Sequence, residues 1–203
     1  MEQPTTSSAP KFAFLYLLSL FTLLLTSISV GMIIFQIINK YIFDALEQFN
    51  AYSQEPLKFA ISALIISTPI FFFTMRQIQR NLFKGVLAKE SQVRKWLSYF
   101  VLLVSAVVMI FWIITTINEF LSGELTLKAG LKTITVLIIA ASIFSFYLYD
   151  IRRQELVNKK DKVVAIYGYV TLAVIALTFA TSLLIVESPR ETRNRRLDEA
   201  TLN

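Results

Sequence analysis

Apolar residues along this chain gather into five long stretches, which short polar segments separate. The stretches are Phe12–Ile38, Leu57–Met75, Trp96–Ile117, Leu131–Tyr149 and Val163–Val186. An α-helix rises 1.5 Å per residue, so about 20 residues cross the roughly 30 Å hydrocarbon core of a bilayer. Each stretch is of this order or longer, and none carries a charge at its centre. The pattern therefore predicts an all-α membrane protein, a bundle of five transmembrane helices.

Small residues and one proline within the stretches indicate how these helices pack and bend. Ser27 and Gly31 are four residues apart, as are Ala176 and Ala180, so each pair falls on one helix face. Small residues at this spacing let two membrane helices approach closely, which makes both pairs candidate packing positions. Pro69 lies near the centre of the second stretch, where its ring removes a backbone hydrogen bond and predicts a kink.

Basic and aromatic residues border the stretches, and we expect them to anchor the helices at the membrane surface. A cation near an anionic leaflet gains about 1 kcal/mol, so lipids with anionic headgroups at the inner surface are the expected contact. The candidate anchors are Arg76, Arg80, Arg94, Lys95, Trp96, Arg152 and Arg153.

The segment Asn39–Lys58 between the first two stretches has two interpretations. Ile42, Leu46 and Phe49 recur at helical spacing among polar residues, which is typical of a short amphipathic helix on the membrane surface. A helical extension of the first stretch explains the same pattern equally well, so both interpretations stand.

Composition agrees with a membrane protein and disfavours a soluble one. Of the 203 residues, 55% are hydrophobic and 17% are charged, with a mean hydropathy of +0.60. Soluble chains carry about a quarter charged residues. The net charge of +6 could suggest a nucleic-acid partner, but the basic residues flank apolar stretches instead of forming one soluble face. We therefore expect no nucleic-acid binding.

The distribution of Lys and Arg predicts an orientation. If all five stretches span the membrane, 12 of the 20 Lys and Arg residues lie on the side of the N-terminus and 8 lie on the other side. Positive charge concentrates on the cytoplasmic side, which places the N-terminus in the cytoplasm and the C-terminus outside. We expect residues 1–11 to form a disordered cytoplasmic tail, residues 12–186 the membrane domain, and residues 187–203 a charged extracytoplasmic tail.

The sequence carries no residue pattern for catalysis, cofactor binding or metal coordination. It contains neither cysteine nor histidine, which excludes disulfides, thiolate nucleophiles, imidazole catalysis and His- or Cys-ligated metals. The interiors of the stretches hold no ionisable residue, so a carboxylate relay for protons is not expected. Lys132, at the edge of the fourth stretch, is expected to face water. We predict no catalytic residue, no cofactor and no metal, and a protein that is not an enzyme.

Four segments together resemble a family of bacterial multi-pass membrane proteins described as a domain of unknown function, frequent in genomes of candidate phyla. The segments are Val93–Phe100, Gly123–Lys132, Tyr147–Arg153 and Glu187–Glu199. The resemblance covers most of the chain. It implies a multi-pass membrane fold and the bacterial cytoplasmic membrane, and it implies no particular activity.

Two functions from different classes fit these features. The leading hypothesis is a non-enzymatic scaffold or regulatory component of a membrane complex, acting with a membrane-protein partner or as a homo-oligomer. It rests on small packing faces and basic surface segments without accompanying chemistry. The alternative is a channel or facilitative carrier for a neutral or apolar solute, lined by Gly31, Pro69 and the cluster Tyr167–Thr171.

Overall fold

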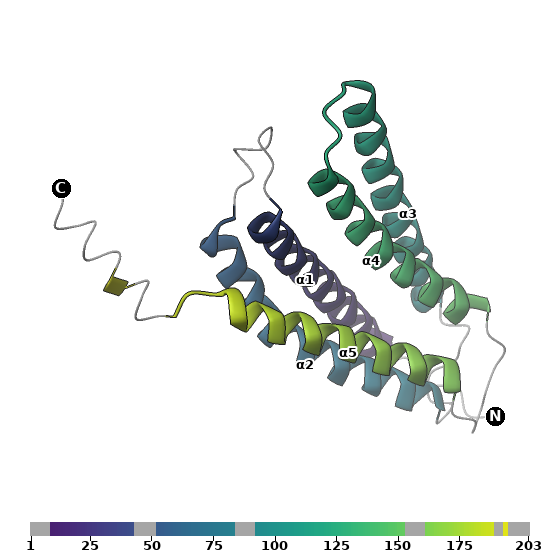
Figure 1. The fold of residues 1–203 in the computed structure, drawn as a ribbon. Coiled ribbons are helices and arrows are strands. Elements are labelled where there is room, and N and C mark those ends of the chain that lie inside the picture. The colour runs from purple at the N-terminus through teal and green to yellow at the C-terminus, as the bar shows by residue number, and fades with distance from the viewer. Residues whose placement is uncertain (1–8, 43–51, 84–91, 153–160, 189–192, 195–203) are drawn as a thin grey trace, which may run out of the picture.

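Five long helices make up the fold. The computed structural model describes residues 9–42, 52–83, 92–152, 161–188 and 193–194 (Figure 1). The helices are α1 (Ala9–Tyr41), α2 (Gln54–Phe83), α3 (Gln92–Leu121), α4 (Leu127–Arg152) and α5 (Lys162–Ile185). All five are long and apolar enough to span a membrane. The predicted all-α fold with five apolar helices is therefore confirmed for the described part of the chain.

The helix bounds follow the predicted stretches closely. The first four helices extend beyond the predicted stretches at both ends, and α5 ends one residue before Val186. Helix α1 continues to Tyr41, into the segment with two interpretations, but residues 43–51 lie outside the described residues. Most of the two expected tails lies outside them as well.

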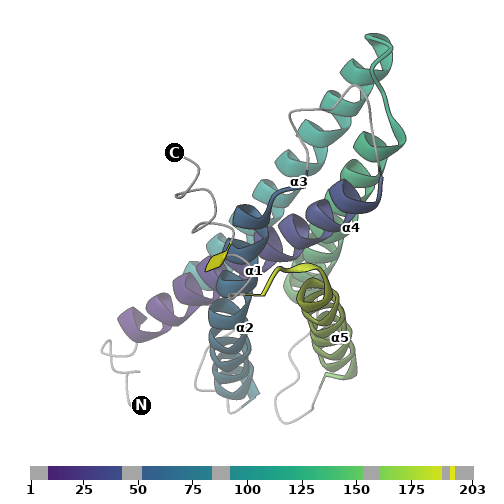
Figure 2. The same ribbon diagram turned by 60° about the vertical axis from the view of Figure 1, so that its left-hand side comes forward.

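The helices alternate in direction, and α1 lies between two pairs of helices. Figures 1 and 2 show α3 and α4 on one side of α1, and α2 and α5 on the other. Helix α1 contacts all four of its neighbours, most extensively α2. We refer to the end of the bundle where α1 begins as the first end, and to the other as the far end. Helices α3 and α5 also begin at the first end, and α2 and α4 finish there.

The contact between α1 and α2 follows a seven-residue period. One set of buried positions on each helix is spaced alternately three and four residues apart, which is the spacing of a coiled-coil seam. They are Ser19, Thr22, Thr26, Ser29, Ile33 and Gln36 on α1, and Leu57, Ala60, Leu64, Ser67, Phe71, Thr74 and Ile78 on α2. The seam is apolar toward the far end and rich in small hydroxyl residues toward the first end.

These buried hydroxyl groups are satisfied inside the protein. Thr22, Ser29 and Thr74 each donate a hydrogen bond to the carbonyl oxygen four residues earlier in the same helix. The hydroxyls of Thr26 and Ser67 bond to each other across the seam at 2.9 Å. Ser and Thr side chains are small, so the two helices can pack closely, and the hydroxyl groups remain hydrogen-bonded.

Helices α3 and α4 form a hairpin with a short connection. Gly123 adopts a φ of 72°, a left-handed conformation that glycine reaches without steric cost, and its N–H bonds to the Phe120 carbonyl at 3.1 Å. The Thr126 hydroxyl accepts from the Ala129 N–H at 3.2 Å and so caps the start of α4. The hydroxyls of Thr116 and Thr133 meet between the two helices at 2.8 Å.

At the far end, Tyr52 and Gln54 attach the end of α5 to the start of α2. The Tyr52 hydroxyl donates to the Ile185 carbonyl at 2.9 Å and accepts from the Gln54 side-chain amide at 2.6 Å. The Gln54 side-chain oxygen accepts from the Glu187 N–H at 3.3 Å. These bonds satisfy backbone groups at the end of α5, which helix geometry leaves without intrahelical partners.

The same region reaches α1. The Gln36 side-chain oxygen accepts from the Ser53 N–H at 3.0 Å, and the Lys40 ammonium lies 5.2 Å from the Tyr52 ring centroid. Three helix ends are therefore connected through polar contacts at the far end. Burial raises the pKa of the Tyr52 phenol above its ordinary value, and the nearby Glu187 carboxylate and Tyr41 raise it further.

The hydrogen bond between Thr26 and Ser67 can be measured by a double-mutant cycle. We expect a coupling of about 0.6 kcal/mol between Thr26→Val and Ser67→Ala, the typical value for interhelical hydrogen bonds in membranes. The free energy of unfolding in mixed micelles provides the readout. Ser62→Ala is the control, because Ser62 is exposed and its hydroxyl donates to the Lys58 carbonyl of its own helix. A coupling indistinguishable from zero would show that the contact adds nothing to helix packing.

The contribution of Tyr52 to the stability of the fold is expected to decrease at high pH. A phenol whose pKa is raised by folding contributes stability below its unfolded pKa near 10, and this is lost as pH rises through the folded pKa. Stability of the unmodified protein should therefore fall more steeply above pH 10 than that of Tyr52→Phe. Below pH 10, Tyr52→Phe should cost about 0.5–1.5 kcal/mol. The free energy of unfolding in mixed micelles, measured against pH for both proteins, provides the readout, and parallel pH profiles would contradict this role of Tyr52.

Candidate functional site

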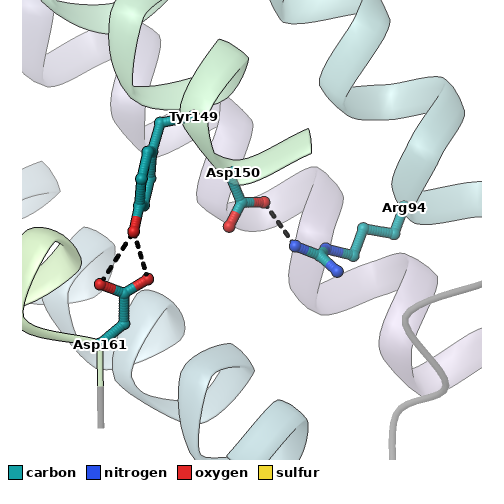
Figure 3. A network of polar contacts seen from close by, with 4 residues as sticks. All are labelled: Arg94, Tyr149, Asp150 and Asp161. Atoms are coloured by element: carbon teal, nitrogen blue, oxygen red, sulfur yellow. Dashed lines mark hydrogen bonds and ion pairs between the residues drawn. The ribbon is translucent and has the colours of Figure 1, made fainter. Parts of the chain in front are cut away.

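A buried ion pair joins α3 to α4 at the first end. Arg94 lies in the first turn of α3 and Asp150 in the last turn of α4, and the antiparallel hairpin brings these turns together. The Arg94 Nη2 donates to Asp150 Oδ2 at 2.6 Å, and the two side chains are only 5% and 10% exposed (Figure 3). Charged side chains are rarely buried to this degree unless they are paired.

Helix electrostatics explain why each charge requires the other. A helix favours anions at its N-terminus and cations at its C-terminus by about 0.3–1 kcal/mol each. Arg94 places a cation at the N-terminus of α3, and Asp150 an anion at the C-terminus of α4. Each charge thus stands at the helix end that disfavours its sign, and the pairing offsets both penalties.

A small cavity adjoins the ion pair. Its volume, measured as the space open to the centre of a water molecule, is about 20 Å³. The wall is drawn from four helices: Tyr16, Ser19 and Leu20 of α1; Met75, Ile78 and Gln79 of α2; Arg94, Leu97 and Ser98 of α3; and Phe146, Tyr147 and Asp150 of α4. The ion pair therefore lies where both helical hairpins meet.

The residue next to Asp150 makes a separate polar contact with α5. The Tyr149 hydroxyl lies 3.1 and 3.0 Å from the two carboxylate oxygens of Asp161 (Figure 3). Asp161 Oδ1 also accepts from the Val163 N–H at 2.9 Å and so caps the start of α5. Two consecutive residues of α4 thus contact two different helices at the first end.

Most of the candidate membrane anchors lie on the surface at the first end. The exposed ones are Arg76, Arg80, Lys95, Trp96 and Arg152, whereas Arg153 lies outside the described residues. Arg94 differs from the expectation because its guanidinium is buried against Asp150 instead of reaching outward. Helix α3 thus directs Arg94 inward and the next two residues, Lys95 and Trp96, outward.

The candidate packing residues have different surroundings. A Cβ built on Gly31 would meet the Ile139 side chain of α4 at 3.7 Å, so Gly31 faces that helix. Ser27 is half-buried and donates to its own helix, at the Leu23 carbonyl. Ala176 and Ala180 are exposed, and α5 packs instead through the buried residues Ile175, Thr178, Ser182 and Ile185.

Pro69 lies within one continuous helix and is exposed. Of the two hydroxyl residues before it, Ser67 bonds to Thr26 of α1. The Thr68 hydroxyl is buried and has no hydrogen-bond partner among the described residues. The kink expected at Pro69 remains a prediction.

The ion pair was not predicted from the sequence, although a signal for Arg94 exists. Arg94, Ser98 and Ser105 recur at intervals of four and seven residues, so they share one face of α3, and all three are buried. A polar stripe on an apolar helix indicates a face that packs against protein. Nothing comparable marks Asp150, because its position opposite Arg94 depends on how the hairpin closes.

The expectation that Lys132 faces water is wrong. Its side chain is buried, as are those of Lys128, Ala129 and Thr133, and these four positions form one face of α4. The bond between Thr133 and Thr116 shows that this face turns toward the protein. Among the described residues, no group of three or more acidic residues could hold a metal ion.

Comparison with known families identifies the chain. The sequence model of a domain of unknown function, DUF5671, matches residues 13–146, about two thirds of the 203 residues. The protein belongs to the DUF5671 family. The match includes most of α1 to α4 and stops just before Tyr147 and Asp150. No curated protein and no solved structure matches the chain.

Within this DUF5671 protein, removing one charge of the pair should destabilise the fold strongly. Arg94→Met leaves the Asp150 carboxylate buried without its arginine, which we expect to cost about 3–5 kcal/mol of unfolding free energy in mixed micelles. The double variant Arg94→Met/Asp150→Leu should recover most of this loss, because it removes both buried charges. Lys95→Met, at the adjacent exposed lysine, should change stability by less than about 0.5 kcal/mol. Equal effects of Arg94→Met and Lys95→Met would contradict a stabilising ion pair.

Proposed function

We propose that this DUF5671 protein is a non-enzymatic integral membrane protein that scaffolds or regulates a membrane complex. The observation that carries the proposal is the large apolar surface outside the α1–α2 seam. In the most apolar part of each of α3, α4 and α5, only 11% of the residues are buried within the chain. Such helices present broad faces both to lipid and to other membrane proteins, while the polar groups of the interior serve packing.

Helix α5 is the element that we propose as the partner contact. Its buried residues Ile175 and Ile185 belong to an apolar cluster with residues of α1 and α2, and it exposes Ala176 and Ala180. In lipid, association depends on close van der Waals packing, for which small residues at a four-residue spacing are suited. The partner is another membrane protein or a second copy of this chain.

The proposed location is the bacterial cytoplasmic membrane, with the chain crossing it five times. The exposed Arg76, Arg80, Lys95 and Arg152 all lie at the first end, where they suit anionic headgroups. By the preference for cytoplasmic positive charge, the first end and the N-terminus face the cytoplasm, and the end of α5 faces outward.

A channel or carrier function remains a prediction with less support. Of its candidate lining residues, Pro69 and Tyr169 are exposed, and Gly31 packs toward α4. None of them lines the cavity beside Arg94 and Asp150.

The proposal is tested by gentle purification of the tagged protein from native membranes, with mass spectrometry of the co-purifying proteins and of the particle mass. We expect a reproducible partner or a homo-oligomer. Ala176→Phe should abolish this association, because the phenyl ring prevents the close approach of a second helix. Val170→Phe, at another exposed position of α5, should retain it.

The proposal fails if the purified protein alone shows catalytic turnover or solute flux in proteoliposomes. It also fails if the protein is monomeric and without a partner under conditions that keep known membrane complexes intact. In the second case, a panel of neutral solutes would be the next assay, with Tyr169→Ala as the test variant for flux.

A further inference from the structure

An aromatic surface lies on the outward face of α3 at the first end. Trp96 and Phe100 are four residues apart, and their rings stack nearly parallel, with centroids 5.9 Å apart and 14° between the planes. Both residues are exposed, as are Leu103 and Val107, which continue the same face of the helix. From Trp96 to Val107 the helix rises about 17 Å, close to half of the roughly 30 Å hydrocarbon core. This face therefore matches the length of one lipid leaflet.

Lys95 places a positive charge at the start of this face. Its side chain is exposed, and in the part of the chain that the structure describes no acidic side chain pairs with it. The preceding residue, Arg94, points inward, and its charge is balanced by Asp150. Trp96 follows directly, and tryptophan is typical of the headgroup level of a membrane. An unpaired ammonium and exposed aromatic rings thus lie side by side.

We propose that Lys95, Trp96, Phe100 and Leu103 form a binding site for one anionic phospholipid, such as a phosphatidylglycerol. The Lys95 ammonium binds the phosphate, the Trp96 indole lies at the level of the headgroup, and an acyl chain runs along Phe100 and Leu103. The site rests on the proposed membrane location of the first end, and it specifies which lipid occupies one place there.

Charge complementarity favours an anionic lipid over a zwitterionic one. The described carboxylates at the first end are engaged within the protein: Asp150 pairs with Arg94. Asp161 accepts hydrogen bonds from the Tyr149 hydroxyl and the Val163 N–H. A zwitterionic headgroup would bring its own ammonium group to this end, whereas phosphatidylglycerol brings only the phosphate charge. The exposed charges among the described residues at this end are all positive: Arg76, Arg80, Lys95, Arg152 and Lys162.

The chain contains two tryptophans, which allow a direct test. Trp96 belongs to the proposed site, whereas Trp112 packs edge-on against Phe35 of α1, with ring centroids 5.8 Å apart. Trp112→Phe and Trp96→Phe each leave a single tryptophan. In symmetric liposomes, phosphatidylcholine with brominated acyl chains quenches the fluorescence of a tryptophan that it contacts. Unbrominated phosphatidylglycerol, added to the mixture, relieves this quenching according to its relative affinity for the same place.

We expect phosphatidylglycerol to be preferred about threefold or more at Trp96, the order of effect that one basic residue near the headgroups provides, and not at Trp112. In the Trp112→Phe protein, Lys95→Gln should remove the preference. Lys162→Gln is the matched control, because it removes the same charge from an exposed lysine at the first end of α5. Helix α5 lies on the other side of α1 from α3, so this variant should retain the preference (Figure 2).

Quenching of Trp96 by brominated phosphatidylcholine without any preference for phosphatidylglycerol would overturn the binding site and leave the membrane location intact. Equal losses of preference in Lys95→Gln and Lys162→Gln would overturn it as well, because general surface charge would then explain the effect. Absence of quenching at Trp96 would contradict the membrane location itself. The comparison of Trp96 with Trp112 uses no Lys95 variant, so it tests the site even if Lys95→Gln does not fold.

Discussion

The close contact between α1 and α2 is the constraint on which the other helix contacts depend. Lipid tails are as apolar as leucine side chains, so helices in a bilayer associate through close packing and hydrogen bonds instead of hydrophobic burial. The seam provides both, because Ser and Thr are small and bond to their own backbone or, as Thr26 and Ser67 do, to each other. Since α1 also contacts α3, α4 and α5, this pair forms the base against which the remaining helices pack.

Polar contacts outside the seam concentrate at the two ends of the bundle. At the first end, Arg94 and Asp150 join α3 to α4, and Tyr149 and Asp161 join α4 to α5. At the far end, Tyr52 connects the start of α2 to the end of α5. Long apolar helices can slide past one another, because each turn resembles the next. Specific polar pairs at both ends fix the register that apolar side chains leave undetermined.

The limits of the DUF5671 match divide the fold into a matched part and helix α5. These limits, residues 13–146, include the α1–α2 seam and nearly all of the α3–α4 hairpin, whereas α5 lies beyond them. Helix α5 is held by the contacts at its two ends and by Ile175, Thr178, Ser182 and Ile185 along one face. The family match thus covers most of four helices, and the fifth helix packs against α1 and α2.

The sequence by itself determined the number of helices, their approximate bounds and the grouping of basic residues between them, because apolar length and flanking charge are local properties. The seven-residue period of Ser19, Thr22, Thr26 and Ser29 is also visible in the sequence, whereas the pairs Ser27–Gly31 and Ala176–Ala180 were the predicted packing positions. Only the tertiary structure decided that Arg94 turns inward while Lys95 turns outward, that Thr178 and Ser182 pack while Ala176 and Ala180 do not, and that Asp150 is the partner of Arg94. Each of these depends on which helix faces which, and contacts between residues 56 positions apart leave no periodic trace along the chain.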